Sequence, residues 1–440
     1  MPSTAFTNAL LFDYTAQTVR RGTLCQCDGV IVETGPDIEP QDSDEVVDLD
    51  GALLMPGLVN GHTHLYSALA PGMPLPAATP TNFHEKLRYV WWILDRGHDT
   101  VSIRASGHIG SLDALRCGVT TLIDHHASPS SIEGSLTTLG NAVNEVGCRA
   151  VLCYEVTDRN GPAGAVAGIA ENERFITACQ QKPNGTLAGL VGAHASFTVS
   201  DGTLDACADL CRRLHVGLHI HVCEDPVDRR LSTQQYGAAP LDRLARVGLA
   251  DMPGSILAHG THLTDDERAR LATWSRSVTV AHACRSNMNN AVGYTPIAKH
   301  DPDMVMIGTD GIDQDILAEC TTAWFKARDA HLPYDPQSLL TMLATAARSA
   351  ATALGVPLGT LKPGAAADLV VTDYRPHTPI DDSNLGAHLV FALNARHITH
   401  VMVNGQWKLR DQKIMTLDES TVRSEAQGIA GELYRRIGCT

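Results

Sequence analysis

The stretch Gly57-Leu58-Val59-Asn60-Gly61-His62-Thr63-His64 decides the fold, because a short apolar run leads directly into titratable side chains. Seven more runs with strand character follow it: 119–123, 150–154, 187–192, 217–220, 255–258, 278–281 and 304–307. Helical patterns such as 202–214 and 265–273 lie between them. Alternating strands and helices indicate parallel strands with crossover helices, and eight such units predict an α/β fold, a (β/α)8 TIM-like barrel.

Polar, titratable residues follow every one of these runs. In chain order they are His62 and His64; Asp124, His125 and His126; Glu155; His194; His221 and Glu224; His259; His282, Cys284 and Arg285; and Asp310. The carboxyl ends of all strands in such a barrel converge on one face, where function is located, so these side chains are expected to lie together. The sequence therefore predicts a functional site at this end of the barrel.

Both ends of the chain are β-rich. Asp28-Gly29 lies between two strand-like segments, and Asn404-Gly405 lies between two others. Such dipeptides favour two-residue type I′ hairpins, since both central positions need positive φ. We therefore expect residues 1–55 and 360–440 to form one β-sandwich domain, and residues 56–359 to form the barrel.

The composition excludes several functional classes. The net charge is 34 − 49 = −15, and an acidic surface repels phosphate backbones, so nucleic-acid binding is not expected. No stretch approaches 18 consecutive apolar residues, and the N-terminus lacks the basic and apolar regions of a secretory signal. The 12 cysteines form no CxxC pair, which is typical of reduced thiols. We expect a cytoplasmic protein without a membrane partner, and a homo-oligomer stays open.

A metal site is the simplest explanation of the histidines. His62 and His64 are two apart on a strand, so both side chains point to the same face and can chelate a metal such as zinc. His221 and Asp310 add a third nitrogen and a carboxylate, and this set leaves a coordination position for water, as in catalytic zinc sites. The alternative for the histidine pair is burial as hydrogen-bonded core residues.

The order of the motifs resembles a known family. The stretches that match, in sequence order, are 56–64, 221–224, 258–260 and 308–311. They are similar to the motifs of the amidohydrolase superfamily, in its mononuclear deaminase and chlorohydrolase branch. The likeness is greatest to SsnA-type aminohydrolases, through residues 124–129, 192–194 and 285–290. It extends over nearly the whole chain and includes residues 364–371 of the β-rich end.

The resemblance implies a set of site residues. His62, His64, His221 and Asp310 would bind one divalent metal ion per chain, with zinc as the first expectation and iron or manganese as alternatives. Glu224 and His259 would be catalytic, together with Asp310. Binuclear relatives carry a bridging, carboxylated lysine on the fourth strand. Residues 187–194 contain no lysine, which favours a single metal.

The residue types suit a hydrolytic reaction. A metal lowers the pKa of a coordinated water towards ~7. Asp310 could then orient this water and accept its proton, Glu224 could protonate a ring nitrogen, and His259 could hydrogen-bond the attacking oxygen. Loops after the barrel strands supply further candidates for substrate contact. These are His126, His194, Arg159, Arg285, Asn289 and Trp92.

We expect a small heterocyclic substrate, namely a purine, pterin, pyrimidine or triazine, from which an amino group is removed by hydrolysis. Hydrolytic opening of a cyclic amide such as an imidazolone is the alternative, and dechlorination is a third. A non-catalytic binding protein on the same fold is a hypothesis from another class. The presence of Glu224 and His259 beside all four ligands argues against it, because a scaffold needs none of these residues.

Overall fold

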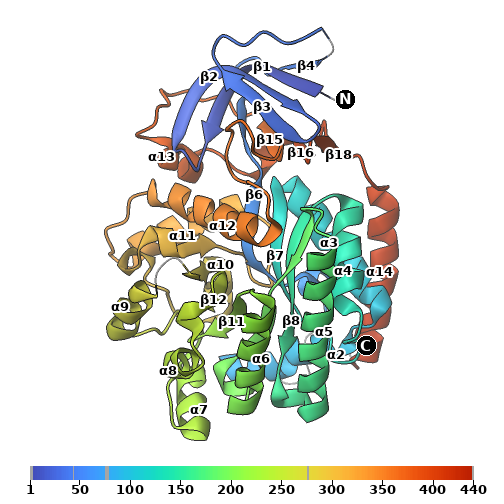
Figure 1. The fold of residues 1–440 in the computed structure, drawn as a ribbon, viewed down its shortest axis with the longest axis vertical. Coiled ribbons are helices and arrows are strands. Elements are labelled where there is room, and N and C mark those ends of the chain that lie inside the picture. Colours follow the sequence, from blue (N-terminus) through green and yellow to red (C-terminus); the bar gives the residue numbers. More distant parts are fainter. Residues whose placement is uncertain (1–2, 43, 75–78, 275–276, 439–440) are drawn as a thin grey trace.

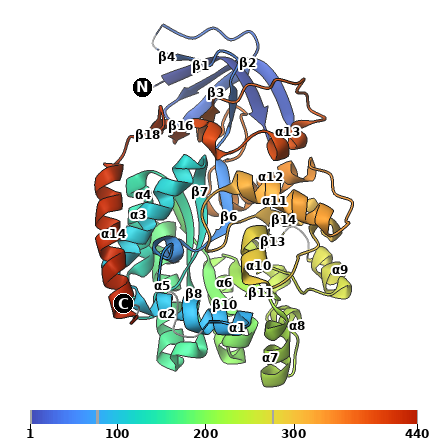
Figure 2. The same cartoon turned by 180° about the vertical axis from the view of Figure 1, so that it is seen from behind.

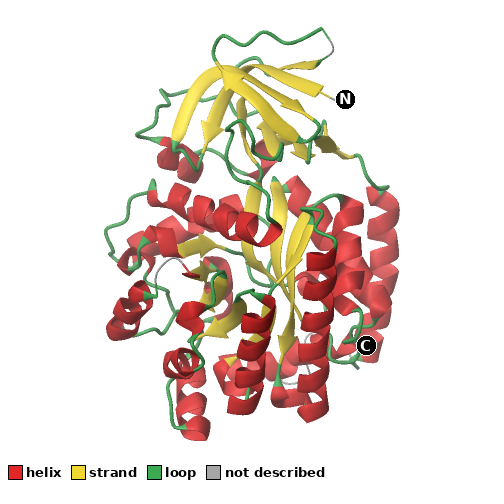
Figure 3. Cartoon of the chain, viewed as in Figure 1, coloured by secondary structure: helices red, strands yellow, loops and turns green. Residues whose placement is uncertain are grey.

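The structure is a computed structural model of the chain, and it describes residues 3–42, 44–74, 79–274 and 277–438. A barrel of parallel strands lies beside a second, separate sheet, which is at the top of the view in Figure 1. Figure 3 shows helices surrounding the barrel strands. The predicted (β/α)8 barrel with a β domain built from both termini is confirmed.

Eight parallel strands form the barrel in sequence order. They are β6 (Leu58–Thr63), β7 (Val119–His126), β8 (Arg149–Val156), β10 (Val191–Ala195), β11 (Leu218–Val222), β12 (Ser255–His259), β13 (Val278–His282) and β14 (Val305–Ile307). A short strand, β9 (Leu187–Gly189), pairs with β8 at the start of the fourth unit. The barrel closes through backbone bonds of 2.9 Å from the N–H groups of Thr309 and Asp310 to the carbonyl oxygen of His62.

Helices connect and cover the strands. The larger ones are α3 (Thr100–Arg116), α4 (Ser135–Val146), α5 (Pro162–Gln181), α6 (Asp201–Leu214), α7 (Pro226–Tyr236), α8 (Pro240–Arg246), α9 (Asp265–Thr273), α10 (Cys284–Asn290), α11 (Ile316–Asp329) and α12 (Ser338–Leu354). Two short helices, α1 (Phe83–Lys86) and α2 (Trp92–Gly97), flank a π-helical turn over Leu87–Trp91. None of the described helices combines the length and apolar character needed to cross a membrane.

The termini share one sheet of nine strands. Its strands are β1 (Ser3–Asp13), β2 (Thr18–Cys27), β3 (Val30–Gly35), β4 (Glu45–Asp48), β5 (Leu53–Pro56), β15 (Leu369–Thr372), β16 (Ile398–Val403), β17 (Gln406–Arg410) and β18 (Lys413–Ile414). The sheet is continuous in its hydrogen bonding and has a core cluster of its own, to which Phe6, Leu24, Leu54 and Met402 belong. Positive φ angles at Asp28 and Gly29 fit the predicted hairpin turn.

The C-terminal helix packs on the barrel. Helix α14 (Glu419–Arg436) lies along α3 at one side of the barrel, as Figures 1 and 2 show from opposite sides. Its Ala426 and Leu433 share an apolar cluster with Ala105 and Ile109 of α3. The end of the segment that was expected to belong to the β domain thus packs on the barrel. A second α-helix of this segment, α13 (Leu385–Phe391), contacts α11.

Candidate active site and metal centre

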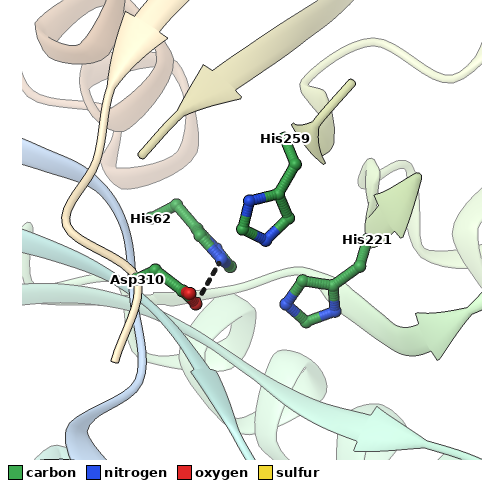
Figure 4. A group of neighbouring side chains, drawn as sticks. All are labelled: His62, His221, His259 and Asp310. Atoms are coloured by element: carbon green, nitrogen blue, oxygen red, sulfur yellow. Dashed lines mark ion pairs between the residues drawn. The ribbon is translucent and has the colours of Figure 1, made fainter. Parts of the chain in front are cut away.

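The strand ends bring four donor side chains together. His62 lies on β6, His221 on β11 and His259 on β12, while Asp310 follows β14. Figure 4 shows these four side chains pointing toward one another. One ligand atom of each lies within 4.8 Å of the others, and all four are largely buried. Such a group of nitrogen and oxygen donors is suited to a divalent ion.

His64 belongs to the same cluster. Its Nε2 lies 2.9 Å from Oδ1 of Asp310 and 3.1 Å from Nε2 of His221. Nε2 of His62 lies 3.4 Å from the same Asp310 oxygen. The four residues expected as metal ligands are therefore neighbours in space, and His259 is the fifth member of the cluster.

The second ring nitrogens hold these histidines in place. Nδ1 of His64 donates to the carbonyl oxygen of His125 at 2.6 Å, and Nδ1 of His221 donates to that of His194 at 2.7 Å. In the neutral rings both Nε2 atoms consequently carry lone pairs, and without a proton or a metal ion between them these lone pairs would face each other across 3.1 Å. Nε2 of His62 is buried and has no hydrogen-bond partner among the described residues. A bound cation would satisfy all three, so the residues fit a metal ion.

The electrostatics also favour positive charge at this point. Burial lowers the pKa of His62 to about 3. Burial acts on His64 in the same direction, but its hydrogen bond to Asp310 and the charge of that carboxylate raise the pKa of His64 to about 9. Burial would raise the pKa of Asp310, yet the neighbouring rings of His62 and His64 hold it well below its ordinary value. Asp310 is therefore an ionised carboxylate that stabilises a cation.

Backbone strain is concentrated at the same strand ends. Cys223, His259 and Asp310 adopt φ angles of 52°, 72° and 55°, in the left-handed region that non-glycine residues rarely occupy. Strain of this kind persists only where the surrounding structure enforces it, and it is common at functional sites. Here it turns the chain at the ends of β11, β12 and β14, so that the side chains face the cluster.

Glu224 lies beside the cluster with the environment of a proton donor. Its Oε2 is 3.6 Å from Nε2 of His259, and its Oε1 accepts a hydrogen bond of 3.4 Å from Asn290. Burial, and then the negative charge of Asp310, raise the pKa of Glu224 well above its ordinary value. Two carboxyl groups with pKa values shifted in opposite directions are suited to act as acid and base in one reaction.

A cavity of about 460 Å³ opens above these residues. His64, His221, Glu224 and Asp310 form part of its wall. Much of its apolar lining comes from the segment after the first barrel strand and includes Phe83, Leu87, Trp91 and Trp92. Flat aromatic surfaces opposite a polar floor provide a slot for a planar ring.

Three of the residues expected to contact substrate line this cavity, namely His194, Asn289 and Trp92. The other three lie outside its lining. Arg285 donates to Asp313 at 2.7 Å and to Glu319 at 2.8 Å, so its charge is taken up beside α11. His126 is buried behind Tyr66 and hydrogen-bonds Ser128 at 3.0 Å.

Arg159 lies one layer behind the cavity wall. It donates to Asp95 at 2.8 Å and to Glu155 at 2.7 Å, and its guanidinium carbon lies 4.7 Å from the centre of the Trp92 ring. It therefore contacts three residues, of which Glu155 and Trp92 line the cavity themselves. Arg159 is thus placed to hold residues of the cavity wall and not to contact the substrate directly.

Some lining residues were not among the expected contacts. They are Tyr66, Ser67, Glu155, Ser286 and Asn290, together with the apolar residues near Trp91. Glu155 carried a usable signal, because it directly follows the third strand-like run. Ser286 lies in the matching stretch 285–290 but was assigned no role, although it donates a hydrogen bond to Asp310 in the structure.

The family model that matches this sequence is that of the Amidohydrolase family, over residues 53–408. The chain belongs to the amidohydrolase family. A 5'-deoxyadenosine deaminase of Methanothermobacter thermautotrophicus is 30% identical over 427 residues, which cover 94% of this chain and 95% of that protein. A 5-methylthioadenosine/S-adenosylhomocysteine deaminase of Desulforudis audaxviator is 29% identical over 410 residues, covering 90% of each chain.

A solved amidohydrolase-fold structure supports the architecture. It is an adenosine deaminase from Xanthomonas campestris with bound zinc. It superposes with a TM-score of 0.84 at 23% identity, over 100% of this chain and 99% of that one. The prediction of the family is thus confirmed, and with it an enzyme that hydrolyses carbon–nitrogen bonds other than peptide bonds. The family and the His/Asp cluster together indicate a divalent metal ion.

Proposed function

We propose that this amidohydrolase removes an amino group from a nitrogen heterocycle by hydrolysis, with aminopurines as the first candidates. The carrying observation is Glu224, a buried acid at a cavity wall next to ionised Asp310 and the histidine cluster. The names of the relatives from Methanothermobacter and Desulforudis support an adenine-type ring. The polar floor and aromatic wall support a flat substrate.

His62, His64, His221 and Asp310 would hold the metal, and zinc suits their three nitrogens and one oxygen. A divalent ion bound there would lower the pKa of a water and so supply a nucleophile near neutral pH. The hydrogen bonds on Nδ1 of His64 and His221 fix the rings so that Nε2 of each faces the ion.

The chain's own residues would move the protons. Asp310 accepts a proton from the attacking water, while Glu224 donates a proton to the ring nitrogen next to the attacked carbon. His259 donates through Nδ1 to Asn287 at 2.9 Å, so its Nε2 is free to accept a hydrogen bond from the water. The carbon gains the water oxygen, and the new hydroxyl group then returns a proton to Glu224. The proton held by Asp310 passes to the amino nitrogen, the carbon–nitrogen bond breaks and ammonia leaves, so both carboxyl groups end in their starting states.

Metal content tests the proposed ligand set. Because three histidine nitrogens and one carboxylate converge on one point, we expect about one divalent ion per chain, with zinc as the preferred ion. Elemental analysis of protein purified without chelators measures this. Two tightly held ions, or none, would contradict a mononuclear centre.

Ammonia release tests the reaction. We expect turnover with at least one aminopurine, pterin or aminotriazine. We expect none with aliphatic amides or short peptides, because an aliphatic amide or a peptide offers no ring nitrogen for Glu224 to protonate. A panel that also contains a cyclic imide and a chlorotriazine separates deamination from ring opening and dechlorination. Faster turnover of the amides or peptides than of every heterocycle would refute the proposal.

A further inference from the structure

Glu155 forms a second polar wall of the cavity, away from the proposed acid Glu224. It is the last but one residue of β8, a strand that is buried throughout, and its side chain is only 3% exposed. Ligand atoms of Glu155, His194 and His221 lie within 4.8 Å of one another, so this wall adjoins the metal cluster. None of the roles assigned above uses this carboxylate.

The buried guanidinium of Arg159 keeps Glu155 ionised. Nη2 of Arg159 donates to Oε1 at 2.7 Å, and Nδ1 of His125 lies 3.3 Å from Oε2. Arg159 is itself buried and is shared with Asp95, at 2.8 Å. A buried carboxylate paired in this way accepts hydrogen bonds and donates none.

His194 adds a second acceptor next to Glu155. Thr198 Oγ1 donates its hydrogen to the carbonyl oxygen of Ala195 at 3.0 Å, so it accepts from Nδ1 of His194 at 2.7 Å. Nε2 of His194 then carries a lone pair, and it lies 4.0 Å from Oε1 of Glu155. No described side chain donates a hydrogen bond to this Nε2. Two acceptors stand side by side at the cavity and have no common donor.

We propose that Glu155 and His194 form an acceptor pair that selects heterocycles bearing an exocyclic amino group besides the amine that leaves. This inference rests on the proposed function. The donor belongs to the reacting ring, since the pair lies within 4.8 Å of His221, one of the proposed metal ligands. Arg159 uses only part of the acceptor capacity of the Glu155 carboxylate, and no described side chain donates to Nε2 of His194. A ring without the donor leaves these desolvated acceptor positions unfilled, which is costly, so such rings are rejected.

Ligand binding tests the proposal without any need for turnover. Dissociation constants are measured by calorimetry for matched pairs that differ in one amino group: 2-aminopurine against purine, and pterin against 4-hydroxypteridine. We expect the aminated member of at least one pair to bind about tenfold more tightly to the unmodified protein. Equal binding within both pairs would overturn the proposal.

Variants attribute the preference to the cavity carboxylate. Glu155→Gln should reduce the ratio of the two dissociation constants about tenfold, so that both members of the pair bind nearly equally. Glu155→Asp should have the same effect while it keeps a negative charge beside Arg159. Asp95→Asn is the matched control, because Asp95 pairs with the same arginine but does not line the cavity. It should leave the preference intact. An equal loss in Asp95→Asn, or no loss in either Glu155 variant, would contradict the assignment.

A further pair of ligands distinguishes a hydrogen-bond donor on the ring from one on an attached sugar. Purine riboside and its 2′,3′-dideoxy analogue share one ring and differ only in the hydroxyl groups. If Glu155→Gln changes the ratio for this pair alone, the donor is on the sugar and the ring assignment is wrong. If the deaminase proposal fails, the unmodified protein would still bind the aminated member of a pair more tightly but would release no ammonia from any heterocycle.

Discussion

Replacing Glu224 with glutamine should lower kcat by about 10²-fold to 10⁴-fold while the metal stays bound. Glutamine keeps the size and polarity of the side chain, and Asn290 can still hydrogen-bond it. It cannot release a proton to a ring nitrogen, which is the step assigned to the raised pKa of Glu224. Turnover of the best heterocycle and elemental analysis of the same preparation measure the two effects.

His221→Ala provides the contrast for this variant. It removes an Nε2 atom that faces His64 at 3.1 Å, so it should reduce metal content, and activity should fall with it. The two variants therefore differ in their metal content even where both lose activity. If Glu224→Gln lost its metal and His221→Ala retained it, the roles of the two residues would have to be exchanged.

The barrel could be predicted because its signal is repeated. Each of the eight strand-like runs is weak by itself, but all of them lead into polar residues, and only a common strand-end face explains this. The hairpins at Asp28-Gly29 and Asn404-Gly405 were predictable for a local reason, since all four residues have positive φ. The division of the fourth unit into β9 and β10 has no such signal, because it depends on pairing with β8.

The site was predictable where it lies on strands and less so where it lies on loops. His62, His64 and His221 point inward because strand geometry fixes their direction. Arg285 is the second residue of α10, beyond the end of β13. The direction of its side chain is set by Asp313 and Glu319, which are remote in sequence. Sequence reasoning could not locate these two carboxylates, so it placed the arginine at the substrate.

The same limit applies to supporting residues. Arg159 looked like a substrate contact because it is a cation near a strand end. The structure surrounds it with Asp95, Glu155 and the ring of Trp92. Asp95 lies in the long segment after the first strand, and no local pattern shows that this segment folds back against β8. Charge balance inside a protein is a tertiary property.

One buried ion pair joins the β domain to the barrel. Arg149, the first residue of β8, donates from Nε and Nη2 to the two oxygens of Asp368 at 2.7 and 2.9 Å. Both side chains are at most 3% exposed. Asp368 also accepts from the backbone N–H of Asn404, at 2.8 Å, so it holds the β16–β17 hairpin as well. The pair thus fixes the position of the terminal sheet on the strands that carry the site.

Arg149→Met should therefore lower the free energy of unfolding by about 3–5 kcal/mol, because it leaves the Asp368 carboxylate buried without its counter-charge. Urea unfolding followed by circular dichroism measures the loss. Arg20→Met is the matched control: Arg20 also binds both oxygens of one aspartate, Asp382, but that pair is exposed and water replaces the lost contacts. Arg149→Met combined with Asp368→Leu should recover much of the stability, since no buried charge then remains unpaired. A double variant as unstable as Arg149→Met alone would show that the guanidinium acts through its other contacts, the carbonyl oxygen of Gly185 at 2.5 Å and Oδ1 of Asn404 at 3.4 Å, and not by neutralising Asp368.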